Sequence, residues 1–521
     1  MELLQIRDFG KSGLNSDLPK WDLPASFLTS ANNFRIFSNK ISPMGGSSKL
    51  IDTPAGFHPS HIISTPTPAA NYWLLAGNGF YIYDGTNFFD IGATLPGFVE
   101  GDKHQWTSCK LGRVPVINNG TYAPTYWDDQ VTGQDMQVLP FDIAETWLDK
   151  LWLCKSMRSF GPYLIAMNMT EDNLFYPDRV RWSHPAEQGM VPATWDETDP
   201  ASLASRNDLS GDGGDIIDGL ALRNSFVLYR DFGITTMNFS GDSFVFSFEN
   251  LTSSIQIANI NSIVEVKGRH FIISVNDIVM NTGDQIQSLM HNRLRVKFAS
   301  TVNQDAIESA FGVHQEITKE FWAFVPTGDS IYPNQVWKYN YRDDAWSMHD
   351  IVPTAHSDFG ALDRDSRIWQ TWLEDWEVAS GNWARQNNRV LNQTLLGVQN
   401  NDTATSNIQE LDFYTTETPY QTILERTEFP LTNMQDVSTI TRIYPHISGS
   451  IPVKIQVGSH QHAGGPARWT PERSFHPGTD RKVDVITTGE LFAFRIIVDI
   501  ETGGSFEFSG LDIEYTHAGL R

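Results

Sequence analysis

The chain contains very little cysteine. Its 521 residues include only Cys109 and Cys154, and both lie in apolar, strand-like surroundings. Two cysteines cannot supply the disulfide framework that stabilises small secreted domains. We expect two free, buried thiols that behave as small hydrophobic side chains, in a protein made in a reducing compartment. A single disulfide between them is the alternative.

Long hydrophobic runs and an export signal are also missing. No run approaches the ~18 consecutive apolar residues that a membrane-spanning helix needs. Residues 1–8 lack the cationic stretch and apolar run of a signal peptide. The sequence therefore predicts a soluble protein with no membrane-spanning segment, which is not exported by the usual route.

Basic residues are scarce relative to acidic ones. The chain has 38 lysines and arginines against 62 aspartates and glutamates, for a formal net charge of −24. This balance argues against attraction to nucleic acid or to an anionic membrane as the main mode of binding. It does not argue against a position near DNA, because an acidic wall around a channel would keep a polyanion from adhering and let it pass.

The short motifs of common catalytic chemistry are absent. The sequence has no Gly-x-Ser-x-Gly elbow, no P-loop and no Gly-x-Gly-x-x-Gly after a predicted strand. It also lacks the Ser-x-Asp-x-Gly-x-x-Trp boxes and the arginine triad of sialidase-type enzymes. Carboxylates are plentiful, but nothing singles out a pair whose environments would separate their pKa values. We therefore predict that the protein is not an enzyme, and we assign it no catalytic, cofactor-binding or metal-binding residues and no cofactor.

Two clusters leave a metal site as an alternative. Residues 207–216 gather oxygen ligands and glycines that would suit calcium, but they lack EF-hand spacing and are more typical of a solvated turn. His460 and His462, with His476 and Asp480 downstream, could place imidazoles for zinc. The glycines and proline that follow His462 instead indicate a loop tip.

What the chain does contain is the pattern of an all-β protein. Aromatic residues make up 12% of it, and Gly, Pro, Asn and Asp interrupt short apolar runs. Residues 72–76, 80–83 and 88–91 read as three strands joined by Asn-Gly and Asp-Gly turns, the strongest hairpin dipeptides. Helical periodicity is nearly absent, and the best helix candidates are residues 304–311 and 362–376.

The apolar runs recur in a common form, which is a strand, a turn and a second strand that carries an aromatic side chain. The recurrences are residues 114–120 with 125–128, 225–230 with 233–237, 271–274 with 277–280, and 320–325 with 335–339 and 344–347. Four-stranded units at about this period are what a β-propeller requires, because one blade cannot bury both of its faces. The sequence predicts a propeller of five to seven divergent blades with inserted loops, and a string of separate β-sandwiches is the alternative. Five tryptophans on these strands could stack sugars or bases but are more typical of core: Trp73, Trp127, Trp322, Trp337 and Trp346.

Changes in composition suggest where the domains begin and end. Residues 171–218 carry 11 acidic residues against 3 basic ones, together with several prolines and glycines, and we predict an acidic insertion there. We expect part of it, around Asp196, Glu197 and Asp199, to face a lumen or a partner. Residues 420–521 alternate as strands of a C-terminal β-sandwich-like domain. The predicted order is an extended N-terminal strap at 1–50, the propeller at 51–419 and the sandwich at 420–521.

The N-terminal region holds the most specific motif of the chain. Residues 13–24 read Gly-Leu-Asn-Ser-Asp-Leu-Pro-Lys-Trp-Asp-Leu-Pro, followed by Ala-Asn-Asn-Phe-Arg at 31–35 and by Gly45 and Gly46. Each proline holds its predecessor in extended backbone, so the segment would tie the chain to itself or to a neighbour.

This motif resembles the N-terminus of virion nozzle proteins, the tail tubular protein B type, of short-tailed bacteriophages. Shorter resemblances lie at residues 179–183, 218–223, 227–230, 508–515 and 518–521. The chain is much shorter than the longest members of that family, so their large inserted domains are not expected here.

The resemblance implies a structural virion protein and no catalytic residues. It implies a propeller-based subunit that forms a ring, usually a hexamer, at the distal end of the tail after assembly in the host cytoplasm. The ring would contact the tail adaptor, support fibres or spikes, and continue and gate the channel through which viral DNA passes without sequence-specific binding. The alternatives are a receptor-binding or glycan-degrading tail protein and a propeller that acts as an interaction scaffold.

Overall fold

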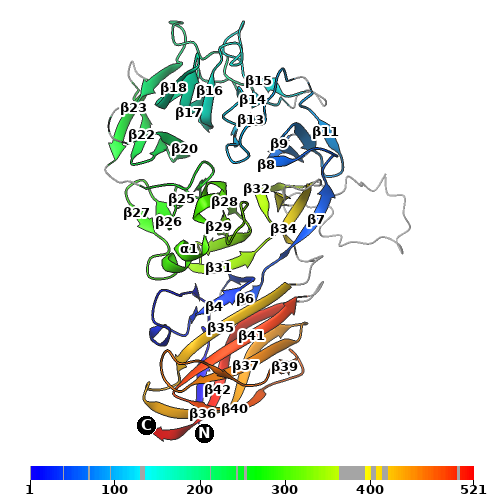
Figure 1. Ribbon diagram of the computed structural model, residues 1–521, viewed down its shortest axis with the longest axis vertical. Helices are drawn as coiled ribbons and strands as arrows, with labels where there is room; N and C mark the ends of the chain where they lie inside the picture. The colour runs from blue at the N-terminus through cyan, green and yellow to red at the C-terminus, as the bar shows by residue number, and fades with distance from the viewer. Residues whose placement is uncertain are drawn as a thin grey trace, which may run out of the picture.

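The computed structural model is built almost entirely of β-strands arranged in two parts (Figure 1). It describes residues 2–38, 40–67, 71–93, 95–128, 135–209, 211, 213–241, 245–251, 255–362, 393–399, 406–413, 420–500 and 505–520. The upper part in Figure 1 is a β-propeller and the lower part is a β-sandwich, with both chain termini at the end of the sandwich far from the propeller. No helix in the described part of the chain is long and apolar enough to cross a membrane.

The described residues form seven four-stranded antiparallel blades. The strands of each blade are given from the inner to the outer one. The first blade is β8 (Pro59–Pro66), β9 (Asn71–Gly77), β10 (Phe80–Tyr83) and β11 (Phe88–Asp90), and the second is β12 (Thr107–Leu111), β13 (Val114–Asn118), β14 (Thr125–Tyr126) and β15 (Gln137–Val138). The third blade is β16 (Leu153–Phe160), β17 (Tyr163–Glu171), β18 (Leu174–Trp182) and β19 (Ser205–Asp208). The fourth blade is β20 (Ile216–Leu222), β21 (Ser225–Arg230), β22 (Ile234–Phe239) and β23 (Phe246–Leu251), and the fifth is β24 (Ile263–Glu265), β25 (His270–Ile273), β26 (Ile278–Asn281) and β27 (Ile286–Ser288). The sixth blade is β28 (Phe311–Gln315), β29 (Glu320–Val325), β30 (Gln335–Asn340) and β31 (Ala345–Asp350). This arrangement confirms the predicted propeller and gives it the largest blade number of the expected range.

The seventh blade joins the two ends of the propeller sequence. Its inner strands are β32 (Thr354–Ala361), β33 (Gln393–Gln399) and β34 (Asn407–Phe413), and its outer strand is β7 (Gly46–Asp52), which pairs antiparallel with β34. The inner strand β32 in turn packs against β8 of the first blade. The ring is therefore closed by hydrogen bonds between distant parts of the chain rather than by a local hairpin.

Two six-stranded sheets form the sandwich. One contains β1 (Glu2–Ile6), β5 (Phe34–Phe37), β6 (Lys40–Pro43), β36 (Asp436–Gly449), β40 (Val483–Gly489) and β42 (Phe506–Leu520). The other contains β4 (Ser30–Asn32), β35 (Tyr420–Pro430), β37 (Val453–His460), β38 (Arg468–Trp469), β39 (Arg473–Phe475) and β41 (Leu491–Ile500). Each sheet of the sandwich thus combines strands from the N-terminal and the C-terminal parts of the chain.

The N-terminal segment 1–50 does not form a separate strap. Its strands β1, β4, β5 and β6 belong to the sandwich, and β7 belongs to the propeller. Between them, β2 (Gly13–Leu14) and β3 (Phe27–Leu28) add two parallel strands to the outer edge of the sixth blade. Gly13 has φ +80°, and a Cβ there would lie 2.3 Å from the carbonyl oxygen of Trp346, so only glycine permits this approach.

The acidic segment 171–218 is not an insertion as a whole. It includes the last residue of β17, all of β18 and β19 and the start of β20, so that only the connection from 183 to 204 is a long loop. The acids, prolines and glycines of this segment suggested an interruption, but β18 pairs antiparallel with β17, and β19 pairs antiparallel with β18.

The predicted strands at 72–91 and the two candidate helices have different outcomes. The three strands at 72–91 are confirmed as β9, β10 and β11. The candidate helix at 304–311 is a 3-10 helix, η2 (Gln304–Ser309), and the described α-helix α1 (Arg295–Thr301) lies just before it. Of the candidate at 362–376, all but Leu362 lies outside the described residues.

The residues expected to be core are buried. Cys109 and Cys154 are free and buried, and the five tryptophans predicted as core are at most 4% exposed. Burial raises the pKa of the Cys109 thiol to about 12, so this thiol stays protonated and is a poor nucleophile at neutral pH.

Candidate functional site

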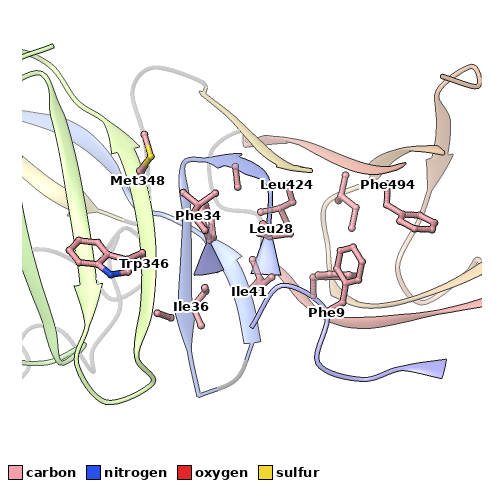
Figure 2. Packing of buried hydrophobic residues seen from close by; sticks show 14 of the residues in the cluster. Phe9, Leu28, Phe34, Ile36, Ile41, Trp346, Met348, Leu424 and Phe494 are labelled. Atoms are coloured by element: carbon pink, nitrogen blue, oxygen red, sulfur yellow. The ribbon is translucent and has the colours of Figure 1, made fainter. Parts of the chain in front are cut away.

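The N-terminal motif lies where the propeller meets the sandwich. Its apolar residues belong to one continuous core that reaches from the fifth and sixth blades into both sandwich sheets. Figure 2 shows Phe34 and Ile36 between Trp346 on the propeller side and Leu28, Ile41 and Phe494 on the sandwich side. Each of these side chains is at most 2% exposed. The motif therefore supplies hydrophobic contact to both parts at once.

Asn15 shapes the first Leu-Pro turn of the motif. Its side chain is 1% exposed, and its Oδ1 accepts hydrogen bonds from the backbone N–H groups of Asp17 and Leu18, both at 3.2 Å. Its Nδ2 donates to the carbonyl oxygen of Asn292 at 3.1 Å. An asparagine in this role closes a local turn and attaches it to the loop before α1.

A buried arginine holds the second turn. The 3-10 helix η1 (Lys20–Asp22) precedes Leu23, and Arg426 on β35 reaches both ends of it. Arg426 Nη1 donates to the carbonyl oxygen of Lys20, and Nη2 donates to that of Leu23, each at 2.7 Å. The residue is fully buried, and burial lowers the pKa of Arg426 to about 10, although Glu428 acts in the opposite direction.

Replacing Arg426 with methionine should release this turn. The carbonyl groups of Lys20 and Leu23 would lose their donors, at a cost of about 1–3 kcal/mol for each one left unsatisfied. Limited proteolysis with trypsin should then cleave after Lys20 many times faster than in the unmodified protein. The same change at Arg473, an exposed position on β39, is the control and should leave cleavage at Lys20 unchanged. Unchanged cleavage in the Arg426 variant would contradict the assigned role.

Asn33 connects the sixth blade to the sandwich. It lies in the left-handed region, with φ +58°, and its N–H donates to the carbonyl oxygen of Met348 at 2.9 Å. Its Nδ2 donates to the carbonyl oxygen of Gln421 at 3.0 Å, and its carbonyl oxygen accepts from Thr422 Oγ1 at 2.8 Å. Its Oδ1 lies 2.9 Å from Nδ1 of His349, which is buried. Asn33 thus bonds to both domains through its backbone and its side chain.

A buried ion pair continues this contact. Arg35 Nε donates to Glu320 Oε1 at 3.0 Å, and Arg35 Nη2 donates to Glu320 Oε2 at 3.2 Å. Oε2 also accepts from Trp322 Nε1 at 2.9 Å and from Thr318 Oγ1 at 2.8 Å. The Glu320 side chain is 2% exposed. A bidentate pair of this kind specifies orientation as well as contact.

The axis of the propeller is filled by a second polar network. Arg158 on β16 makes a bidentate ion pair with Asp218 on β20, at 3.0 and 2.6 Å, and donates to the carbonyl oxygen of Ser108 at 2.9 Å. Asn261 accepts from Arg158 Nη2 at 2.9 Å and donates from Nδ2 to the carbonyl oxygen of Trp106 at 2.7 Å. Burial acts to lower the pKa of Arg158, but the Asp218 carboxylate outweighs it and raises that pKa. Both oxygens of Asp218 are therefore already engaged.

Two stacked histidines lie beside this network, at the contact between the first and seventh blades. The rings of His61 and His356 are 3.9 Å apart, and His61 Nε2 lies 2.8 Å from Ser108 Oγ. Burial holds the pKa of His61 well below its usual range and lowers that of His356 to about 3. The cavity that they line, together with Trp106 and Asn261, measures about 20 Å³. That volume holds a water molecule but neither a sugar ring nor a nucleic acid strand.

Several acids of segment 171–218 pair with arginines of the third blade. Glu171, which is 5% exposed, accepts from Arg179 at 2.9 Å and from Arg181 at 3.1 Å. Arg179 also forms a bidentate pair with Asp208 at 2.7 and 2.8 Å. These contacts consolidate the outer strands of the blade.

The three acids singled out for a lumen or a partner have local contacts. Glu197 lies 3.5 Å from Arg206 Nε and 3.8 Å from Arg181 Nη1. Asp196 accepts from the Thr198 N–H at 2.8 Å, and Asp199 accepts from the Ala201 N–H at 2.9 Å. Asp196 and Asp199 thus close exposed turns. Which of the two surfaces they face stays a prediction.

The candidate metal ligands have other partners. His460 Nδ1 lies 2.7 Å from the carbonyl oxygen of Gly465, and His476 pairs with Asp480 at 3.2 Å. In the calcium alternative, Asp208 pairs with Arg179, while Asp212 lies outside the described residues. A search of the described residues finds no group of three or more His, Cys, Asp or Glu side chains placed to hold a metal ion.

A larger concavity lies on the outer face of the sandwich, on the sheet that contains β1, β36 and β42. It measures about 480 Å³, and its lining consists of Glu2, Leu3, Tyr444, Pro445, His446, Arg481, Asp512 and Glu514. We call it the sandwich groove. No local sequence pattern predicts this groove, because its lining combines β1 with residues of the C-terminal domain.

Separation along the chain also explains why the sequence did not reveal the partners of the N-terminal motif. The motif itself was identified, but its partners Glu320, His349 and Arg426 lie far along the chain. The Arg35–Glu320 pair spans 285 residues, and the bond from Arg426 to Leu23 spans 403.

Comparison with known proteins leaves the family of the chain open. No family model matches it, and no curated protein matches it. Among solved structures, it is similar to BBS1N from a complex with ARL6DN, with a TM-score of 0.40, 11% identity, and coverage of 71% of this chain and 97% of the other.

Two further structures show comparable or weaker similarity. PorZ, a bacterial surface component of the type-IX secretion system of Porphyromonas gingivalis, gives a TM-score of 0.37 at 10% identity, with coverage of 83% of this chain and 46% of that protein. An exo-β-1,3-galactanase from Phanerochaete chrysosporium gives 0.24 at 8% identity, with coverage of 79% and 96%. At these TM-scores and identities no activity or partner carries over to this chain.

Proposed function

We propose that this chain is a structural subunit that works by assembly, and specifically a nozzle subunit at the distal end of a short phage tail. The observation that carries the proposal is the use of the N-terminal motif. The residues that resemble nozzle proteins, from Gly13 to Gly46, are the ones that join the propeller to the sandwich. They do so through buried contacts of Asn33 and Arg35.

A rigid connection of this kind suits a subunit of a ring. A ring that bears fibres or transmits a gating movement needs each subunit to keep its two parts at a constant angle. The junction combines a shared hydrophobic core with a bidentate ion pair, so bending it would expose apolar surface and separate buried charges.

The filled propeller axis places a constraint on the proposed channel. DNA could not pass along an axis occupied by Arg158, Asp218 and Asn261. In the proposed assembly the lumen therefore lies between subunits, and each propeller forms part of its wall. The net charge of −24 supports a wall to which DNA does not adhere.

The test is the oligomeric state of the full chain and its place in the virion. We expect light scattering after size exclusion to give a multimer, and negative-stain images to show a ring with a central lumen. Antibodies against the chain should label the tail tip of short-tailed virions. A chain that stays monomeric at every concentration and is absent from virions would contradict the nozzle and favour a monomeric interaction scaffold. Turnover of a host polysaccharide by the purified chain would contradict the non-enzymatic assignment.

A further inference from the structure

The sandwich groove has features that the proposed assembly role does not use. Its volume of about 480 Å³ falls in the range of small-molecule sites, about 300–1,000 Å³. It lies on the sheet that carries both chain termini, at the end of the molecule away from the propeller (Figure 1). It is separate from the axial cavity and from the junction.

The floor of the groove offers side chains rather than backbone. β42 pairs with β36 on one side and with β1 on the other over the residues that line the groove. Its N–H and C=O groups are therefore occupied by the sheet ladders, and a peptide could not add to β42 as a further strand. A ligand here would be recognised by side-chain contacts alone.

The carboxylates of the groove lie next to basic or hydroxyl side chains of the protein. Glu514 accepts from Arg442 Nη1 at 3.1 Å and from the Tyr444 hydroxyl at 3.0 Å. Asp512 lies 3.6 Å from Arg7 Nη2, and its Oδ1 lies 3.1 Å from His446 Nε2. These acids are thus held in place and their charge is locally compensated.

Glu2 and Arg481 add one acidic and one basic group to the lining of the sandwich groove. Glu2 accepts from the Tyr515 hydroxyl at 2.7 Å, and Arg481 is an exposed cation of the lining. Acidic and basic groups therefore occur together around the groove. Such a surface gives little net attraction to a ligand of either sign, while each matched carboxylate keeps lone pairs that accept further hydrogen bonds.

The apolar part of the lining is small and well defined. Tyr444 is half-buried, and its ring position is fixed by the hydroxyl bond to Glu514. Leu3, on β1, is 54% exposed. Tyr444 on β36 and Leu3 on β1 lie on opposite sides of β42, which carries the acceptors Asp512 and Glu514. Two apolar positions with acceptors between them suit an extended ligand that has C–H faces and many hydroxyl donors.

We propose that the sandwich groove binds a neutral oligosaccharide. The ring of Tyr444 and the side chain of Leu3 contact the C–H faces of neighbouring sugar residues, while Glu514 and Glu2 accept hydrogen bonds from their hydroxyls. This binding site goes beyond the proposed assembly function and requires no chemistry on the sugar. It would give the subunit a contact with a glycan surface.

The experiment measures binding of defined sugars to the full chain by saturation-transfer NMR and calorimetry. The probes are the neutral trisaccharides maltotriose, cellotriose and galactotriose, with anionic sialyllactose for comparison. At least one neutral probe should bind with a Kd of about 1 mM or tighter. Tyr444→Ala should weaken that binding by about tenfold, and Leu3→Ala should weaken it severalfold.

Matched variants separate the groove from the rest of the sheet. Ile486→Ala removes an 80% exposed side chain from β40 of the same sheet, outside the groove, and should leave binding unchanged. Tyr444→Phe keeps the ring and should retain most of the affinity. Because Leu3 is exposed, its alanine variant should stay folded and keeps the test decisive if Tyr444→Ala does not fold.

Several outcomes would overturn the proposal. They are binding of no neutral probe, binding of sialyllactose alone, and affinity that neither Tyr444→Ala nor Leu3→Ala changes. Loss of self-association in the Leu3 and Tyr444 variants, without any sugar binding, would show that a second copy of the chain occupies the groove. Failure of sugar binding would leave the ring test of the assembly role unaffected.

Discussion

Replacing Glu320 with alanine should lower the free energy of unfolding by about 3–5 kcal/mol, the range for breaking a buried ion pair by removing one partner. Arg35 would keep its charge at a position where its side chain is 10% exposed, with the carboxylate gone. Trp322 Nε1 would also lose its acceptor. Chemical denaturation followed by tryptophan fluorescence measures the change, because Trp322 lies at the site.

A surface ion pair provides the control. Lys40 and Glu507 pair at 2.8 Å with side chains about half exposed, at 53% and 46%. Glu507→Ala removes the same type of residue from the sandwich and should cost at most about 1 kcal/mol. A loss of similar size in the two variants would show that the Arg35–Glu320 pair does not hold the junction. A loss in Glu320→Ala accompanied by a separate early transition of the sandwich would show directly that the pair couples the two parts.

Acid should destabilise the protein well before its carboxylates are protonated. Burial lowers the pKa of His61, His349 and His356, the last to about 3, so these imidazoles stay neutral in the folded state. In the unfolded chain each takes up a proton near pH 6.5. The unfolded state therefore binds more protons between these values, and stability rises with pH across this window. The stabilisation is fully present above about pH 6.5 and is lost as the pH falls toward 3.

The slope of this effect is measurable. Each neutral histidine contributes about 1.4 kcal/mol per pH unit, so the three together give about 4 kcal/mol per unit well below pH 6.5. Denaturation curves recorded at several pH values between about 6 and 4.5 supply the slope. His356→Gln should reduce the slope by about 1.4 kcal/mol per pH unit.

A variant that destabilises without titrating is the appropriate control. Phe311 contacts His356, with ring centroids 5.0 Å apart. Phe311→Leu should lower stability by a similar amount at every pH and leave the slope unchanged. An unmodified slope in His356→Gln would mean that this imidazole is not the neutral buried group described above.

Local turn chemistry explains the predictions that succeeded. The strands at 72–91 follow from Asn-Gly and Asp-Gly dipeptides between apolar runs, since both turn positions favour residues that accept positive φ. The repetition of such units along the chain predicted a propeller for the same reason. Composition was less informative, because the acids of 171–218 suggested an insertion although Glu171 and Asp208 are strand residues paired with Arg179.

Long-range pairing explains the rest. β7 closes the propeller against β34, more than three hundred residues later in the chain, and no pattern near β7 specifies that partner. Gly13, Asn33 and Arg35 stood out as unusual residues, yet their roles depend on Trp346, His349 and Glu320. The sandwich groove likewise exists only where β1 lies beside β42.

The sequence by itself determined the all-β class, the repeated hairpins, the two buried thiols and the special character of the N-terminal motif. Each of these depends on periodicity, turn residues or polarity within a short window. The tertiary structure alone decided the number of blades, the sharing of the N-terminal segment between two domains, the filled axis and the groove. Those features depend on which distant strands pair and on which buried charges meet, and a local sequence pattern does not specify either.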